Sequence, residues 1–173
     1  MSGIKATPHV CYISMLCEQG SEEHSVCSLH SEGPDDGRWF GRALGAAAQL
    51  SIVSISNGAR LPDVGQFDAI VLGGTFHGVH DGRPWQLRLR AWLQAHRNTG
   101  KPLLGICGGH QAMAVVAGGT VTRRPSGPQV GTISLDVSSD GVRHPLLGVC
   151  PGCMILLDLS APAVAYMYAE HSS

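Results

Sequence analysis

A cysteine framed by glycines is the residue of this sequence with the clearest capacity for chemistry. Residues 102–111 read Pro-Leu-Leu-Gly-Ile-Cys-Gly-Gly-His-Gln, an apolar run followed by Cys107 and then by residues at helical spacing. The pattern predicts a short buried strand, a sharp turn at Cys107, and a helix that ends at Gly118-Gly119. A thiol on such a turn lies above the sheet edge, where the helix N-terminus favours developing negative charge. Cys107 is therefore a candidate nucleophile.

The same pattern has a second interpretation, in which Cys107 is an ordinary packing residue. Turns rich in glycine often join a strand to a helix, and thiol reactivity depends on placement, which a sequence shows poorly. Gly105, Gly108 and Gly109 provide room for a tight turn under either interpretation. Both interpretations stay open when the local pattern is taken alone.

A second glycine pair, Gly73-Gly74, follows the apolar run Phe67–Leu72. That run predicts a strand buried on both faces, as parallel strands are. Ligands of open parallel sheets bind at the carboxyl ends of the strands, so two glycines there would let the backbone approach a substrate carbonyl. A simple strand-to-helix turn is the alternative for this pair alone.

The elements that must position these residues follow from hydrophobic periodicity. We expect a buried strand over residues 10–16, a helix over 38–50, a strand over 51–56, a helix over 84–98 and a half-exposed strand over 130–137. Residues 18–36 are polar and predict an exposed loop. The alternation of strand and helix predicts a mainly parallel sheet with Cys107 on the turn after a central strand.

Composition bounds the class of protein and its partners. A chain of 173 residues with 43% hydrophobic and 14% charged residues predicts one folded domain, since domains usually have ~100–200 residues. A net charge of −1 gives no case for binding nucleic acid or an anionic membrane. The chain has no apolar run near the ~18 residues of a membrane helix and no signal-peptide pattern. These features predict a cytoplasmic protein.

The six cysteines are expected to be free thiols in a reducing compartment, because the chain is neither short nor evidently secreted. Cys150 and Cys153 form a C-x-x-C pair. A redox site would need a strand-to-helix context there, and a zinc site would need a second pair of ligands at suitable spacing. Neither is present in the flanking sequence, so no metal site is predicted.

The two glycine-containing stretches together resemble the class I, triad-type glutamine amidotransferases. Residues 105–111 are similar to the Gly-x-Cys-x-Gly-His-Gln nucleophile motif of that family, and residues 67–74 to its strand and oxyanion loop. Val79-His80-Asp81 with Pro84-Trp85 is similar to the next segment of stand-alone members, and residues 117–121 also fit.

The likeness covers residues 60–135 well and residues 8–56 loosely, while residues 148–173 match no segment of the family. The resemblance implies a single amidotransferase-like α/β domain over residues 1–173, with a mainly parallel, flavodoxin-like sheet and helices on both faces. Its C-terminal part is expected to be incomplete or divergent. An antiparallel excursion is expected after residue 130.

The resemblance also implies roles for individual residues. Cys107 attacks the amide of glutamine or of a γ-glutamyl compound, and the loop of Gly73 and Gly74, together with Gly108, stabilises the oxyanion. Gln111 helps to hold the substrate. No cofactor is implied, and a synthetase partner stays unidentified. The resemblance assigns no catalytic role to His77 or His80, which we expect to be loop residues.

The sequence departs from the family where the triad should be completed. The family supplies a His and, two residues later, a Glu near the C-terminus, whereas no such pair follows Cys107 here. His144 lies too early and is followed by Pro145 and Leu146, and Glu170-His171 has the reversed order. Three functions remain: weak glutamine hydrolysis through a Cys107 thioester, a catalytically impaired glutamine-binding or regulatory domain, and a γ-glutamyl hydrolase.

Overall fold

The computed structural model describes residues 6–16, 18, 36–96, 99–123, 125, 130–132, 139, 143 and 156–158, and the statements below concern these residues. Those up to Thr122 belong to one compact unit and those from Arg123 onward to a second. We describe each unit by itself. That residues 1–173 form a single domain stays a prediction.

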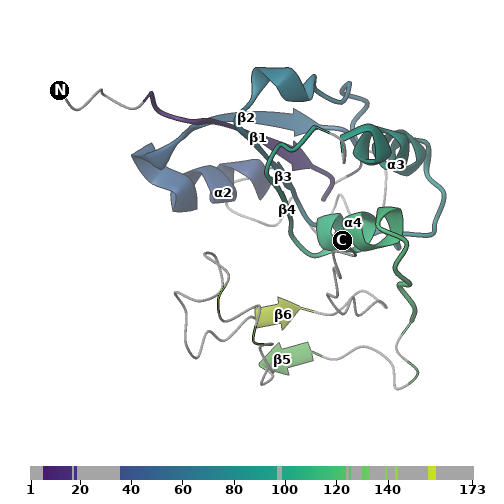
Figure 1. The fold of residues 1–173 in the computed structure, drawn as a ribbon. Coiled ribbons are helices and arrows are strands. Elements are labelled where there is room, and N and C mark those ends of the chain that lie inside the picture. Colours follow the sequence, from purple (N-terminus) through teal and green to yellow (C-terminus); the bar gives the residue numbers. More distant parts are fainter. Residues whose placement is uncertain are drawn as a thin grey trace. The chain divides into compact units, whose positions relative to one another are not determined.

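Four parallel strands form the sheet of the first unit (Figure 1). They are β1 (His9–Ser14), β2 (Gln49–Ser54), β3 (Ala69–Leu72) and β4 (Leu103–Gly105), in the spatial order β2-β1-β3-β4. Every residue of β1 after His9 is buried, as expected for an apolar run that lies between two parallel neighbours. The parallel pairing confirms the prediction made from the alternation of strands and helices.

The first unit contains the α-helices α2 (Asp36–Leu44), α3 (Pro84–His96) and α4 (Gly108–Val116). α3 begins at the proline that suits a first helical turn, and α4 begins directly after Cys107, as predicted. After α4, Gly118 has a positive φ of 91°, the conformation that commonly ends a helix. In the described part of the chain, no helix has the length and apolar character needed to cross a membrane.

The helix predicted over residues 38–50 is shorter than expected. α2 ends at Leu44, a 3₁₀ turn covers Gly45–Ala47, and β2 already begins at Gln49. Gly45 has a positive φ of 57°, which interrupts the helix. The alanines that follow favour helix, but β2 pairs with β1 from Gln49 onward. Pairing within the sheet therefore overrides local helix propensity.

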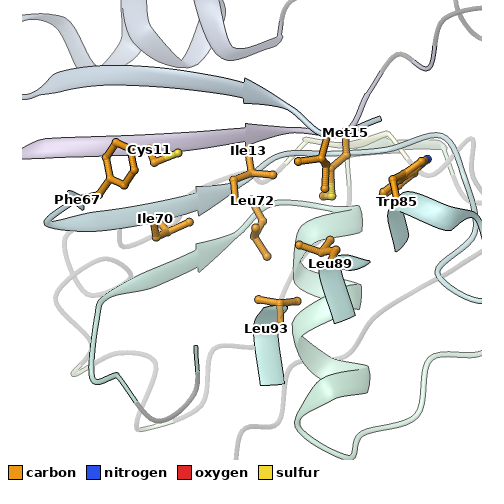
Figure 2. Close-up of a cluster of buried hydrophobic side chains, with 10 residues drawn as sticks. Cys11, Ile13, Met15, Phe67, Ile70, Leu72, Trp85, Leu89 and Leu93 are labelled. Atoms are coloured by element: carbon orange, nitrogen blue, oxygen red, sulfur yellow. The ribbon is translucent and has the colours of Figure 1, made fainter. Parts of the chain in front are cut away.

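Helices cover both faces of the sheet, as predicted. Successive residues of β1 point to opposite faces, and Val10 and Tyr12 pack with Phe40 and Leu44 of α2 on one face. The other face carries the larger cluster, against α3 (Figure 2). Its labelled members are Cys11, Ile13, Met15, Phe67, Ile70, Leu72, Trp85, Leu89 and Leu93.

The strand that leads to Cys107 is not central in this sheet, contrary to the prediction. β4 pairs with β3 at one edge of the four described strands, and β1 and β3 are the inner strands. Leu104 and Ile106 are each 39% exposed. The prediction failed because the order of strands along the chain does not fix their order in the sheet.

The polar stretch predicted as an exposed loop also needs correction at both of its ends. Asp36 is the first residue of α2 and only 7% exposed. Glu18 accepts hydrogen bonds from Arg83 and Trp85. Polar residue types favour exposure in general, whereas these two carboxylates lie against hydrogen-bond donors that compensate for lost water. Residues 19–35 lie outside the described residues.

In the second unit, β5 (Val130–Thr132) pairs with β6 (Leu156–Asp158) in antiparallel fashion. This confirms the start of the strand predicted over residues 130–137 and the expected antiparallel excursion. Residues 133–137 lie outside the described part. β6 falls within residues 148–173, for which the sequence predicted no element.

Candidate active site

Cys107 lies on a strained turn between β4 and α4. It occupies the N-cap position of α4 with φ 51° and ψ −112°, and in the described part of the chain no other residue except glycine has a positive φ. A side chain in such a backbone conformation costs about 1–3 kcal/mol and persists only where its surroundings hold it in place. The thiol is exposed, as the sequence predicts for a nucleophile on a turn above the sheet edge.

The structure brings the Gly73-Gly74 loop next to the thiol. A Cβ atom built on Gly74 would lie 3.6 Å from Cβ and 4.0 Å from Sγ of Cys107. Two backbone hydrogen bonds fix this approach: the N–H of Ile106 donates to the carbonyl of Leu72 at 2.9 Å, and the N–H of Gly109 donates to the carbonyl of Gly73 at 3.0 Å. Two stretches more than thirty positions apart in the sequence therefore form one site.

The glycines at the start of α4 are explained by the close approach of neighbouring atoms and not by their own φ angles. A Cβ atom on Gly109 would lie 2.6 Å from the carbonyl oxygen of Leu72, and one on Gly108 would overlap the side chain of Thr75. Contacts this short with backbone would push α4 away from β3. The two glycines thus allow the Cys107 turn and the Gly73-Gly74 loop to lie in contact.

Gln111 and His110 occupy the first turn of α4. The N–H of Gln111 donates to the carbonyl of Cys107 at 3.1 Å, and its side chain is buried. Its role in holding a substrate stays a prediction. Burial lowers the pKa of His110 below its ordinary value of 6.5, so this imidazole is neutral at pH 7. Its Nε2 atom has no hydrogen-bond partner among the described residues.

The two histidines expected to be loop residues make contacts of a structural kind. Nε2 of His77 lies 3.3 Å from a carboxylate oxygen of Glu18, which accepts hydrogen bonds from the Arg83 guanidinium and the Trp85 indole N–H. Nε2 of His80 lies 3.0 Å from the carbonyl of Val121. These contacts fix the loop between β3 and α3 against neighbouring segments. Sequence reasoning missed Glu18, because its polar neighbours suggested a solvated loop.

A small cavity lies beside the turn between Cys107 and α4. Its volume is about 30 Å³, and Thr75 and Gly108 of the site line it together with core residues of α3 and α4. This volume holds a water molecule but not an amino acid.

His144 and His171, the two histidines that the sequence analysis weighed for a triad, lie outside the described part of the chain. The sequence holds one His-x-Glu, His30-Ser31-Glu32, which precedes Cys107 and also lies outside the described residues. Chain order does not exclude this pair, since such triads are defined by geometry. Within the described residues, no group of three His, Cys, Asp or Glu side chains is arranged to hold a metal ion.

Comparison with known proteins gives a family model and several curated relatives. Residues 41–142 match the family model described as glutamine amidotransferase class-I. The glutamine amidotransferase-like protein chry6 of Gibberella zeae is 32% identical over 100 residues, which is 56% of this chain and 42% of that protein. A component of the glutamine-hydrolyzing GMP synthase of Ignicoccus hospitalis is 37% identical over 79 residues, 46% of this chain and 39% of that protein. Gamma-glutamyl peptidase 5 of Arabidopsis thaliana is 30% identical over 81 residues, 47% of this chain and 32% of that protein.

The chain thus spans less than half the length of these curated relatives. Among solved structures, a glutamine amidotransferase of Thermotoga maritima superposes with a TM-score of 0.57 at 18% identity, covering 82% of this chain and 57% of that one. At this identity the likeness concerns the fold, and it agrees with the parallel sheet described above.

Proposed function

Because this chain belongs to the class I glutamine amidotransferase family, we propose that it cleaves a γ-glutamyl amide through a thioester on Cys107. One observation carries the proposal: an exposed thiol with φ 51° at the N-terminus of α4, against which Gly74 is packed. The surroundings of Cys107 hold this strained conformation, in which the residue is exposed. The adjacent glycines leave space for a substrate carbonyl.

The reaction proceeds in two steps. The Cys107 thiolate attacks the γ-carbonyl carbon, the backbone N–H groups of Gly74 and Gly108 stabilise the oxyanion, and the C–N bond breaks. Ammonia leaves after taking up the proton that the thiol has lost. Water then attacks the thioester carbonyl, which releases glutamate and restores the thiol. Gly73 positions the loop, and Gln111 helps to hold the substrate.

The substrate is a small molecule with a γ-glutamyl carbonyl, and glutamine is the first candidate. Two relatives, named as a gamma-glutamyl peptidase and as part of a glutamine-hydrolyzing GMP synthase, have names that imply this carbonyl with different leaving groups. A γ-glutamyl hydrolase is therefore the second candidate, with an amine in place of ammonia. The ammonia acceptor and a synthetase partner are not identified by the residues described here.

The rate depends on a base that removes the thiol proton. An unassisted cysteine with a pKa of ~8.5 is only a few per cent thiolate at neutral pH, so a chain without a paired His would turn over slowly. Removing the His base from a catalytic triad lowers turnover by about six orders of magnitude without preventing binding. A glutamine-binding or regulatory domain is the alternative, and the lack of a His-x-Glu after Cys107 favours it.

The test measures ammonia release from glutamine between pH 6 and 10 for the wild type and for Cys107→Ser. We expect weak activity that rises across this pH range and disappears in Cys107→Ser, while calorimetry still detects glutamine binding. Robust turnover at neutral pH that is lost in His30→Ala, His144→Ala or His171→Ala would identify the base and refute the claim of an incomplete triad.

A second measurement uses a diazo-ketone analogue of glutamine and maps the alkylated peptide. Cys107 should carry the label, whereas the fully buried Cys11 serves as an internal control that stays unlabelled. Label on several cysteines, or none on Cys107, would exclude the proposed site.

A further inference from the structure

A buried carboxylate lies behind the Gly73-Gly74 loop, and the reaction described above does not use it. Asp36, the first residue of α2, is 7% exposed. Tyr12 Oη donates to its Oδ2 at 2.6 Å, and Ser14 Oγ donates to its Oδ1 at 2.5 Å. Both donors are themselves buried. A carboxylate withdrawn from water is tolerated only when its oxygens accept such hydrogen bonds.

The two donors stand on either side of one residue of β1. Ile13 lies between Tyr12 and Ser14, and its carbonyl accepts a hydrogen bond from the N–H of Gly73 at 2.9 Å. Asp36 therefore holds β1 on both sides of the acceptor that fixes Gly73. Because side chains alternate along a strand, Tyr12 and Ser14 reach Asp36 on the α2 face while Ile13 points into the other core.

The same carboxylate also borders Gly73 directly. A Cβ atom built on Gly73 would lie 2.7 Å from Oδ2 of Asp36 and would overlap the Tyr12 hydroxyl. On its other side, the carbonyl of Gly73 accepts a hydrogen bond from Gly109, two residues after the nucleophile. Gly73 is thus held between the buried carboxylate and the start of α4.

We propose that Asp36, through Tyr12 and Ser14, is a positioning residue that sets the Gly73-Gly74 loop against Cys107. The inference rests on the proposed function, because it makes the Asp36 network responsible for placing the oxyanion donors. Asp36 touches neither the thiol nor a substrate. Its loss therefore affects how well the oxyanion is stabilised and leaves the intrinsic reactivity of the thiol unchanged.

A purely structural role would have a different signature. Asp36 could simply attach α2 to the sheet, a task to which Phe40 and Leu44 also contribute through packing with Tyr12 and Val71. Leu44→Ala weakens that attachment at the other end of α2, so it serves as a matched control. Asp63→Asn removes a carboxylate that accepts a hydrogen bond from Gly65 away from the site, and controls for loss of charge.

The experiment compares the wild type, Asp36→Asn, the milder Tyr12→Phe and both controls in the full chain. The first readout is the hydrogen exchange of the Gly73 amide relative to the Gln49 amide, which bonds to Pro8 at the opposite end of the sheet. The second is the rate of Cys107 alkylation by the glutamine diazo-ketone, which needs the oxyanion donors, divided by the rate with iodoacetamide, which does not.

We expect Asp36→Asn to raise relative exchange of Gly73 at least about tenfold, the size of effect of losing a buried hydrogen bond. The alkylation ratio should fall about tenfold or more, as when an oxyanion donor is misplaced. Tyr12→Phe should show a smaller change in the same direction, and both controls should change neither ratio. If Asp36→Asn does not fold, Tyr12→Phe decides.

Unchanged Gly73 exchange in Asp36→Asn or Tyr12→Phe would overturn the inference, as would an equal fall in the alkylation ratio in Leu44→Ala. A wild type that the diazo-ketone does not label would refute the proposed function. Gly73 exchange would still decide whether Asp36 holds the loop, so the two failures are distinguishable.

Discussion

Cys11 lies in a strand of the parallel sheet and Cys107 on the turn after another strand of it, and the two thiols differ in exposure and in backbone conformation. Cys11 lies within β1, is fully buried, and burial raises the pKa of its thiol to about 11. Cys107 follows β4, is exposed, and stands at the N-terminus of α4 with a positive φ. Two residues of the same type therefore differ because one lies within a strand and the other after its end. Only the second is a candidate nucleophile.

The largest effect on activity is expected when each cysteine is replaced by serine, which tests this contrast. Cys107→Ser should reduce ammonia release to the uncatalysed background and change the free energy of unfolding by less than about 0.5 kcal/mol, as exposed substitutions do. Cys11→Ser should keep Cys107 reactive and lose about 1–3 kcal/mol of stability, because it buries a hydroxyl. Activity assays and urea unfolding of both variants measure this. An equal loss of activity in the two variants would contradict the proposed difference between the two thiols.

The glycines around Cys107 offer the next test. Gly109→Ala should slow labelling of Cys107 by the glutamine diazo-ketone by about tenfold or more, because its methyl group would displace α4 from Leu72 and with it the oxyanion loop. Gly118→Ala, at the other end of α4, meets no neighbouring atom but has φ 91°. It should cost about 1–2 kcal/mol of stability and leave the labelling rate unchanged. Equal labelling of Gly109→Ala and wild type would show that this contact is dispensable.

The raised pKa of Cys11 predicts a loss of stability at alkaline pH. The native state favours the protonated thiol, since its pKa is about 11 against an ordinary 9.0. The stabilisation is therefore complete below pH 9 and is lost as pH rises from 9 to 11. At pH 10.5 the wild type should have lost about 2 kcal/mol relative to Cys11→Val, which cannot ionise. Urea unfolding at pH 8 and 10.5 provides the comparison, and identical pH dependence in the two proteins would contradict it.

The smallest effect is expected from His110, three residues after Cys107. Its pKa is lowered by burial, so the neutral ring is favoured in the native state. Its contribution to stability is complete above the ordinary pKa of 6.5 and is lost as pH falls below that value. His110→Gln should flatten the decline of the unfolding midpoint between pH 7 and 5. A decline as steep as in the wild type would assign the titration to another histidine.

Much of the architecture could be predicted from periodicity and glycine placement. The run before Gly73, the turn at Cys107 and the start of α3 at Pro84 were found because each has a strong local signal in the sequence. The position at which α2 ends was predicted wrongly. The alanines after Gly45 favour a helix, whereas Gln49 pairs with β1 and belongs to the sheet. Asp36 was missed because a carboxylate next to polar residues gives no sign of burial.

The sequence by itself determined that a cysteine stands on a glycine-rich turn between a strand and a helix, because local spacing encodes that turn. Only the tertiary structure decided that Gly74 lies against Cys107, that β4 is an edge strand of the described sheet, and that Asp36 lies behind Gly73. Contacts between residues distant in the chain depend on which strands pair and in what order. No periodicity within one segment carries that information.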